Sequence, residues 1–156
     1  MDFELFNTYS NKTELFIPLD DNDIRIYACG PTVYDYIHVG NARPLIIFDV
    51  LVRFLKLIYP KVTYVRNITD VDDKIIVQAN QNKESINNLT ERTIKAFSDD
   101  ADALFVKKPD FEPRATEHIQ EMLKMIKVLL ENGYAYLSDG HVLFSVSSMP
   151  NYGKLS

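Results

Sequence analysis

Cysteine is nearly absent from this sequence and long apolar runs are absent altogether, and both shortages exclude classes of protein. Cys29 is the single cysteine among 156 residues, so no internal disulfide can form, which agrees with a reducing compartment. No segment has the roughly eighteen uncharged apolar residues that a membrane-spanning helix needs. The first residues carry acidic side chains and lack the basic start of a secretory signal. We therefore expect a cytoplasmic protein with no membrane span.

Positive charge is also scarce. Lysine and arginine number 17 against 22 aspartates and glutamates, which gives a net charge of -5. A domain that binds nucleic acid mainly through phosphate contacts carries a basic excess instead. Any RNA contact is therefore expected to be local, or to be made by another part of the protein. The length fits one domain, which would bury roughly 70% of its unfolded surface.

The most informative stretch is 24–41, IRIYACGPTVYDYIHVGN, where a strand predicted over 24–29 stops at Gly30-Pro31 and a helix follows. A strand that leads through such a loop into a helix gathers free backbone N–H groups at the positive end of the helix dipole. This arrangement predicts a phosphate site, and so an ATP or nucleotide site. His38 could donate to a phosphate oxygen, and Gly40 would let a ligand approach the backbone closely. The alternative is that His38 is a helix-start residue satisfied by neighbouring backbone.

The next segments predict a βαβ unit. The helix over 41–59 has Pro44 in its first turn, where the missing N–H does no harm. One polar stripe, formed by Asp49, Arg53 and Lys56, predicts that this helix is mostly buried. A strand over 62–68 follows, and strand, helix and strand in this order favour parallel pairing. One such unit cannot cover both faces of a parallel sheet, so a second half is expected elsewhere.

The remaining segments predict helices and two hairpins. A loop-rich boundary is expected near 107–114, and the chain is expected to be a fragment whose domains are 1–81 and 82–156. The predicted elements are a hairpin over 3–7 and 12–17, a short helix over 72–81, a long helix over 85–106, a helix over 115–132 ended by Gly133, and a hairpin over 134–137 and 141–146 with an Asp139-Gly140 turn.

Metal sites have little support from the residues themselves. Cys29 could be a buried small hydrophobe or a metal ligand, but neither His118 nor His141 has ligand spacing to it. Asp70, Asp72 and Asp73 could hold Mg²⁺, although acids at a helix start are more often caps. If Cys29 binds a metal, most of its partners lie outside this chain.

Several runs together resemble the bacterial cysteinyl-tRNA synthetases, which are class I aminoacyl-tRNA synthetases. The runs are 29–35 (CGPTVYD), 38–43 (HVGNAR), 64–74 (YVRNITDVDDK), 112–116 (EPRAT) and 152–156 (YGKLS). The resemblance covers essentially the whole chain and corresponds to the amino-terminal third of the family. It implies an α/β fold: the first half of a Rossmann-like, HUP-type nucleotide-binding fold, with an appended helical segment and hairpin.

The resemblance implies ATP-dependent activation of L-cysteine to an adenylate and transfer to tRNA(Cys). His38 to Asn41 matches the "HIGH" element, with valine for isoleucine and asparagine for the last histidine. Cys29 matches the first of four zinc ligands, where the metal binds the substrate thiolate and so selects against serine.

The remaining site residues follow from the same resemblance. Thr32 is implied near the ATP phosphates with a catalytic role beside His38. Thr69 is implied near the cysteine substrate, and Gly30 in both sites. The ATP site is implied to comprise Gly30, Thr32, His38, Gly40 and Asn41, with Mg²⁺ accompanying ATP. The protein is expected to be a monomer.

Two alternatives remain open. The ligase that joins cysteine to an amino-sugar in mycothiol synthesis shares the zinc and ATP chemistry, although a composition rich in Asn, Ile and Lys favours the synthetase. A free-standing domain that binds a nucleotide without catalysis is the other. In the family the other zinc ligands, the lysine-rich "KMSKS" loop and the anticodon-reading domain lie downstream, so the chain alone is expected to be inactive.

Overall fold

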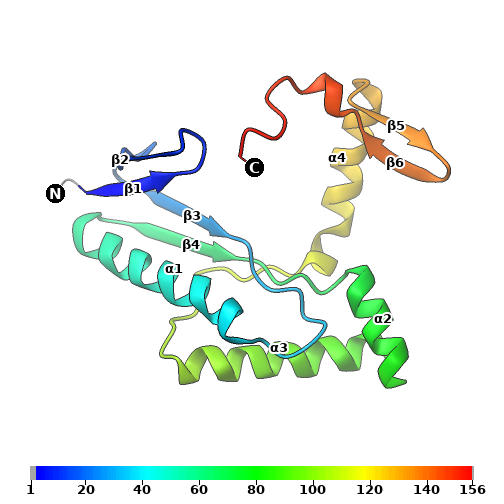
Figure 1. Cartoon of the computed structure of the whole chain (residues 1–156), viewed down its shortest axis with the longest axis horizontal. Helices are drawn as coiled ribbons and strands as arrows, with labels where there is room; N and C mark the ends of the chain where they lie inside the picture. Colours follow the sequence, from blue (N-terminus) through cyan, green and yellow to red (C-terminus); the bar gives the residue numbers. More distant parts are fainter. Residues whose placement is uncertain (1–2, 156) are drawn as a thin grey trace. The chain divides into compact units, whose positions relative to one another are not determined.

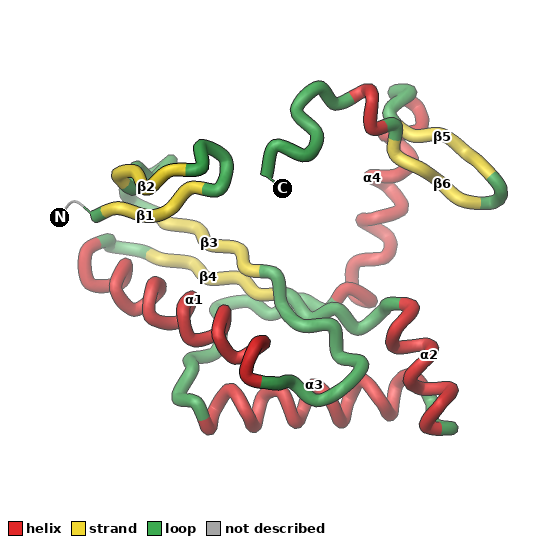
Figure 2. Tube along the Cα trace, viewed as in Figure 1, coloured by secondary structure: helices red, strands yellow, loops and turns green. Residues whose placement is uncertain are grey.

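The computed structural model describes residues 3–155, which form two compact units (Figures 1 and 2). One unit is Pro18–Glu117, and the other combines the segment that ends at Ile17 with the segment that begins at His118. Among the described residues, no helix combines the length and the apolar character that crossing a membrane requires.

The larger unit is built on the predicted βαβ unit. Strands β3 (Ile24–Ala28) and β4 (Val62–Arg66) pair in parallel, with Ile24 opposite Val62 and Ala28 opposite Arg66. Helix α1 (Val39–Ile58) connects them and lies along the strands in Figure 1. The βαβ prediction is confirmed, although both strands end before the residues predicted.

A third extended segment lies along β4 and was not predicted. Residues 110–115 run parallel to it: Phe111 accepts a hydrogen bond from Arg66 N at 3.1 Å and Pro113 accepts one from Ile68 N at 2.9 Å. Proline is compatible with this position because only its carbonyl takes part in the pairing. The sequence showed only a loop-rich boundary here, because two prolines hide an edge strand from pattern analysis.

Helix α1 starts earlier than predicted and is less buried than predicted. Its first residue is Val39, so Pro44 lies in the second turn and cannot donate to the carbonyl four residues back, that of Gly40. The expectation of a mostly buried helix is wrong. The buried residues are Ala42, Leu45, Val52 and Leu55, whereas Ile47, Val50 and Leu57 are 53%, 60% and 84% exposed. Among the described residues, nothing covers that apolar side.

The core of this unit lies where two further helices meet the loops after the strands. Helix α2 (Asp73–Asn82) and helix α3 (Ile86–Ala103) confirm the predicted helices. The longer one stops short of residue 106 because Phe105 is left-handed, with a φ of 58°. The most buried cluster is Val33, Ile68, Ile75, Ala79 and Leu89. Since α3 packs back on α2, the boundary expected between 81 and 82 falls inside this unit, and it stays a prediction about the whole protein.

The other unit contains both predicted hairpins and the predicted amphipathic helix. Helix α4 spans Ile119–Glu131 after the 3₁₀ turn η1 (Ala115–His118), and Gly133 follows it with a φ of 74°. No described residue of α4 is buried: of its apolar stripe, Ile119, Met122 and Leu123 are exposed, and Ile126, Leu129 and Leu130 are partly buried. The strands are β1 (Glu4–Asn7) with β2 (Lys12–Leu15), and β5 (Ala135–Ser138) with β6 (His141–Phe144), followed by the 3₁₀ turn η2 (Val146–Ser148).

The pairing of β3 with β4 is interrupted just beyond the strand ends. The pairing resumes at Thr32 and Thr69. Three residues separate Ala28 from Thr32, but only two separate Arg66 from Thr69, so residues 29–31 form a bulge. Gly30 is the point of closest approach, because a Cβ at this position would lie 1.6 Å from the backbone oxygen of Asn67. Only glycine fits this position without moving the backbone.

We therefore expect Gly30→Ala to destabilise the fold by about 3 kcal/mol or more, because backbone must move to relieve the overlap. The control is Gly133→Ala, which meets no atom within 4 Å but must adopt a positive φ, and which should cost about 1 to 2 kcal/mol. The measurement is denaturant unfolding with the yield of folded protein. Equal losses for the two variants would show that the close approach at Gly30 is relieved easily.

Candidate functional site

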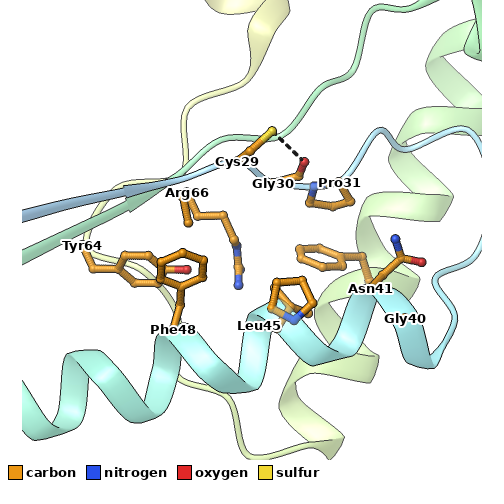
Figure 3. Close-up of a pocket in the computed structure, with 12 residues that line it drawn as sticks. Cys29, Gly30, Pro31, Gly40, Asn41, Leu45, Phe48, Tyr64 and Arg66 are labelled. Atoms are coloured by element: carbon orange, nitrogen blue, oxygen red, sulfur yellow. Dashed lines mark hydrogen bonds between the residues drawn. The ribbon is translucent and has the colours of Figure 1, made fainter. Parts of the chain in front are cut away.

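The carboxyl ends of β3 and β4 and the start of α1 lie around one cavity of about 110 Å³ (Figure 3). In parallel α/β sheets this end of the strands is where ligands bind. Four of the predicted site residues line the cavity, namely Cys29, Gly30, Gly40 and Asn41. His38, Thr32 and Thr69 are not among its lining residues. The predicted residues therefore form two neighbouring groups, one at the helix start and one at the strand ends.

His38 caps α1 reciprocally with Asn41. Its Nδ1 accepts a hydrogen bond from Gly40 N at 3.0 Å, and its backbone N–H donates to Asn41 Oδ1 at 3.1 Å. A neutral imidazole that accepts at Nδ1 carries its proton on Nε2. The cap therefore fixes the tautomer and leaves an Nε2–H donor on an exposed side chain. The alternative that neighbouring backbone satisfies His38 at the helix start is therefore correct for Nδ1 and for the backbone N–H. The cap leaves Nε2 available as a donor.

The free amides expected at the helix start are mostly taken. Of the amides that a helix start leaves free, Gly40 N–H bonds to the His38 ring and Asn41 N–H to the His38 carbonyl at 2.8 Å. The Ala42 N–H makes the regular first helical bond to the same carbonyl, at 3.2 Å. The predicted cradle of free N–H groups is wrong to this extent, because the His38 cap uses them. The positive end of the helix dipole remains at this position.

Gly40 is needed by the cap itself. A Cβ here would lie 2.7 Å from His38 Cε1 and 2.9 Å from Nδ1. Gly40 was expected to let a ligand approach the backbone closely. Among the described residues it is the His38 ring that makes this close approach.

The group at the strand ends is connected through Asn67, a residue that the sequence analysis did not single out. Asn67 Oδ1 accepts from Gly30 N at 2.9 Å, and its Nδ2 donates to Thr69 Oγ1 at 3.1 Å. Thr69 N donates to Pro31 O at 3.0 Å, and its carbonyl accepts from Val33 N at 3.1 Å. An asparagine inside the predicted strand over 62–68, two residues before Thr69, was the only sequence signal for this role.

The Cys29 thiol is exposed, so the interpretation as a buried small hydrophobe is wrong. In Figure 3 its sulfur points away from the side chains below the strand, and the nearest polar contact is Gly30 O at 3.7 Å. Residues 3–155 contain no group of three or more potential metal ligands. Zinc needs three or four ligands. At Cys29 the described residues supply one, and so they do not by themselves fit a zinc ion.

The three acids considered for Mg²⁺ have separate structural roles. Asp70 accepts from the backbone and the hydroxyl of Thr116, at 2.9 and 2.6 Å, and Asp72 caps α2 through Lys74 N at 2.8 Å. Asp73 lies in the first turn of α2. The alternative that these acids are caps is therefore correct for Asp72, and they form no cluster with a third ligand among the described residues.

Two polar groups within the cavity are buried without a hydrogen-bond partner among the described residues, Tyr64 Oη and Arg66 Nη1. The rest of the Arg66 guanidinium donates to Glu112 Oε1 at 2.6 Å and lies 4.9 Å from the centre of the Phe97 ring. Burial raises the pKa of Tyr64 above its usual value, although the charge of Arg66 opposes the shift. Unsatisfied buried groups favour ordered water, and the cavity is large enough to hold it.

Comparisons with known proteins agree with this geometry. Residues 15–156 match the family described as tRNA synthetases class I (C) catalytic domain. The chain is 54% identical over its whole length to the Cysteine--tRNA ligase of Rhodospirillum centenum and 52% identical to that of Saccharophagus degradans. In both cases it spans about 34% of the relative's length.

A solved structure, Mycobacterium tuberculosis methionyl-tRNA synthetase in complex with methionyl-adenylate, matches the fold with a TM-score of 0.66. That match has 18% identity and covers 79% of this chain and 29% of the other. It supports the expected Rossmann-like α/β architecture of class I synthetases. Because the family profile covers nearly the whole sequence, this chain belongs to the class I (C) tRNA synthetase catalytic domain family.

Proposed function

We propose that this chain is part of a cysteine--tRNA ligase. The observation that carries the proposal is the identity of more than 50% along the whole chain to proteins of that name. In the reaction the carboxylate of L-cysteine attacks the α-phosphate of ATP and pyrophosphate leaves. The cysteinyl group then passes to a ribose hydroxyl of tRNA(Cys), and AMP leaves. Since the chain spans about a third of its relatives, the activity belongs to the whole protein.

The helix start is proposed as the ATP side of the site. The cap points the proton of His38 to Nε2, which suits a donor to a phosphate oxygen on which negative charge develops. The Gly40 N–H holds that ring, and Asn41 Oδ1 holds the backbone N–H of His38. Thr32 is proposed to lie near the phosphates, and Mg²⁺ to accompany ATP.

The strand ends are proposed as the cysteine side. Cys29 has the exposed thiol that a ligand of zinc needs, and the further zinc ligands would come from outside the described residues. Gly30 and Thr69 lie beside it, connected by Asn67. We propose L-cysteine, ATP and tRNA(Cys) as the partners of a monomeric, cytoplasmic protein. Transfer to tRNA is the reaction that separates this proposal from a cysteine:amino-sugar ligase and from a nucleotide-binding domain without catalysis.

Replacement of His38 should slow adenylate formation by about 10² to 10³, because a preorganised donor to the developing charge is lost. His38→Asn is the sharper variant, since asparagine is a good helix cap but is too short to place a donor where Nε2 lies. The measurement is ATP–pyrophosphate exchange by the full-length protein, with the exposed His141→Ala as control. Wild-type exchange in His38→Asn would show that the residue acts only as a cap.

Replacement of Cys29 should lower zinc content and raise the KM for cysteine far more than the KM for ATP. Cys29→Ser removes the thiolate ligand and leaves the His38 cap intact. Atomic absorption on the full-length protein measures the metal independently of activity, and pyrophosphate exchange gives both KM values. Full zinc occupancy with an unchanged cysteine KM would exclude Cys29 from the metal site.

A further inference from the structure

The bulge at the end of β3 leaves a gap in the backbone pairing, and Asn67 fills it. Three residues after β3 face only two residues after β4, so the Gly30 N–H has no backbone acceptor. The side-chain oxygen of Asn67 accepts this hydrogen bond instead, at 2.9 Å. An unpaired, partly buried N–H would be costly here. The same amide therefore holds the backbone at Gly30, the residue next to the exposed Cys29.

The orientation of the amide also decides what the Thr69 hydroxyl can do. Since Oδ1 must face the Gly30 N–H, the donor Nδ2 faces Thr69 Oγ1, at 3.1 Å. The hydroxyl oxygen is therefore an acceptor for Asn67, and its own proton points elsewhere. No described residue accepts that proton. The proton of the Thr69 hydroxyl is thus available to another acceptor, and the partly buried Thr69 pairs with Pro31 of the bulge.

We propose that Asn67 is a positioning residue for the bound amino acid. It holds the backbone at Gly30, beside Cys29, and it turns the Thr69 hydroxyl so that this group donates to an acceptor atom of the cysteine substrate. The inference rests on the proposed function, because it assigns a substrate to this end of the site. Asn67 itself does not touch the substrate in this proposal. Cysteine binding depends on the direction of the hydrogen bond between Asn67 and Thr69, in which Asn67 Nδ2 is the donor.

The experiment compares Asn67→Asp with Asn67→Ala in the full-length protein. A carboxylate still accepts the Gly30 N–H, so the bulge should persist and the melting temperature of Asn67→Asp should stay near wild type. Its second oxygen accepts the Thr69 proton, however, and turns the hydroxyl away from the substrate. We expect the KM for cysteine in ATP–pyrophosphate exchange to rise about tenfold or more, with the KM for ATP within about twofold. Asn67→Ala, which loses both bonds, should raise the cysteine KM further and lower the melting temperature.

Thr69→Val tests whether Asn67 acts on cysteine binding through the Thr69 hydroxyl. Alone it should raise the cysteine KM about as much as Asn67→Asp, and the double variant should be little worse than either, because both changes remove the same donor. Asn87→Asp, on the exposed first turn of α3, is the control for added charge.

A cysteine KM within about twofold of wild type in Asn67→Asp, or full additivity with Thr69→Val, would overturn the proposal while leaving the proposed function standing. Absence of cysteine-dependent exchange in the wild-type full-length protein would instead overturn the proposed function, and this inference with it.

Discussion

The candidate site depends on the close approach of two segments of the chain, the one that follows β3 and the one that follows β4. Gly30 and the backbone of Asn67 come so near that no side chain fits at residue 30. The two loops then pair again through Thr32 and Thr69. This second pairing brings two stretches together that are 37 residues apart in the sequence. Cys29 lies at the start of the bulge between the two pairings, on the same exposed side of the strand as Arg25 and Tyr27.

The start of α1 is fixed by a separate set of contacts. The His38 cap uses the ring, the backbone carbonyl and the backbone N–H of one residue, so the histidine is held by three kinds of hydrogen bond. Such a residue loses little further freedom when it binds a ligand, which favours a preorganised donor over a flexible one. The same contacts use the amides that a phosphate would otherwise bind. The positive charge at this point therefore comes from the helix dipole and from the imidazole N–H, with little direct contribution from free backbone amides.

The sequence predicted the site through local features and missed what depends on long-range pairing. His38, Gly40 and Asn41 lie within one turn, so their proximity follows from the helix alone. The βαβ unit, the caps and the Asp139-Gly140 turn were predictable for the same reason, since each is a local rule of backbone geometry. Asn67 was not predictable, because its partners are set by a bulge whose existence depends on the register of two distant strands. Residues 110–115 were missed likewise, since only their position beside β4 makes them a strand.

Burial was the least predictable property. Apolar spacing in α1 and α4 gave the correct helices, but the exposed fraction of Leu57, 84%, shows that an apolar residue can lack a neighbour to cover it. A periodic pattern reports which face of a helix is apolar and carries no information about what packs there. The two groups of the site differ in the same respect. The His38 cap is complete within one helix end. The Cys29 end depends instead on contacts between distant segments, because Asn67 connects Gly30 after β3 with Thr69 after β4. Long-range pairing therefore decides which groups meet at the strand ends, whereas local geometry decides the helix start.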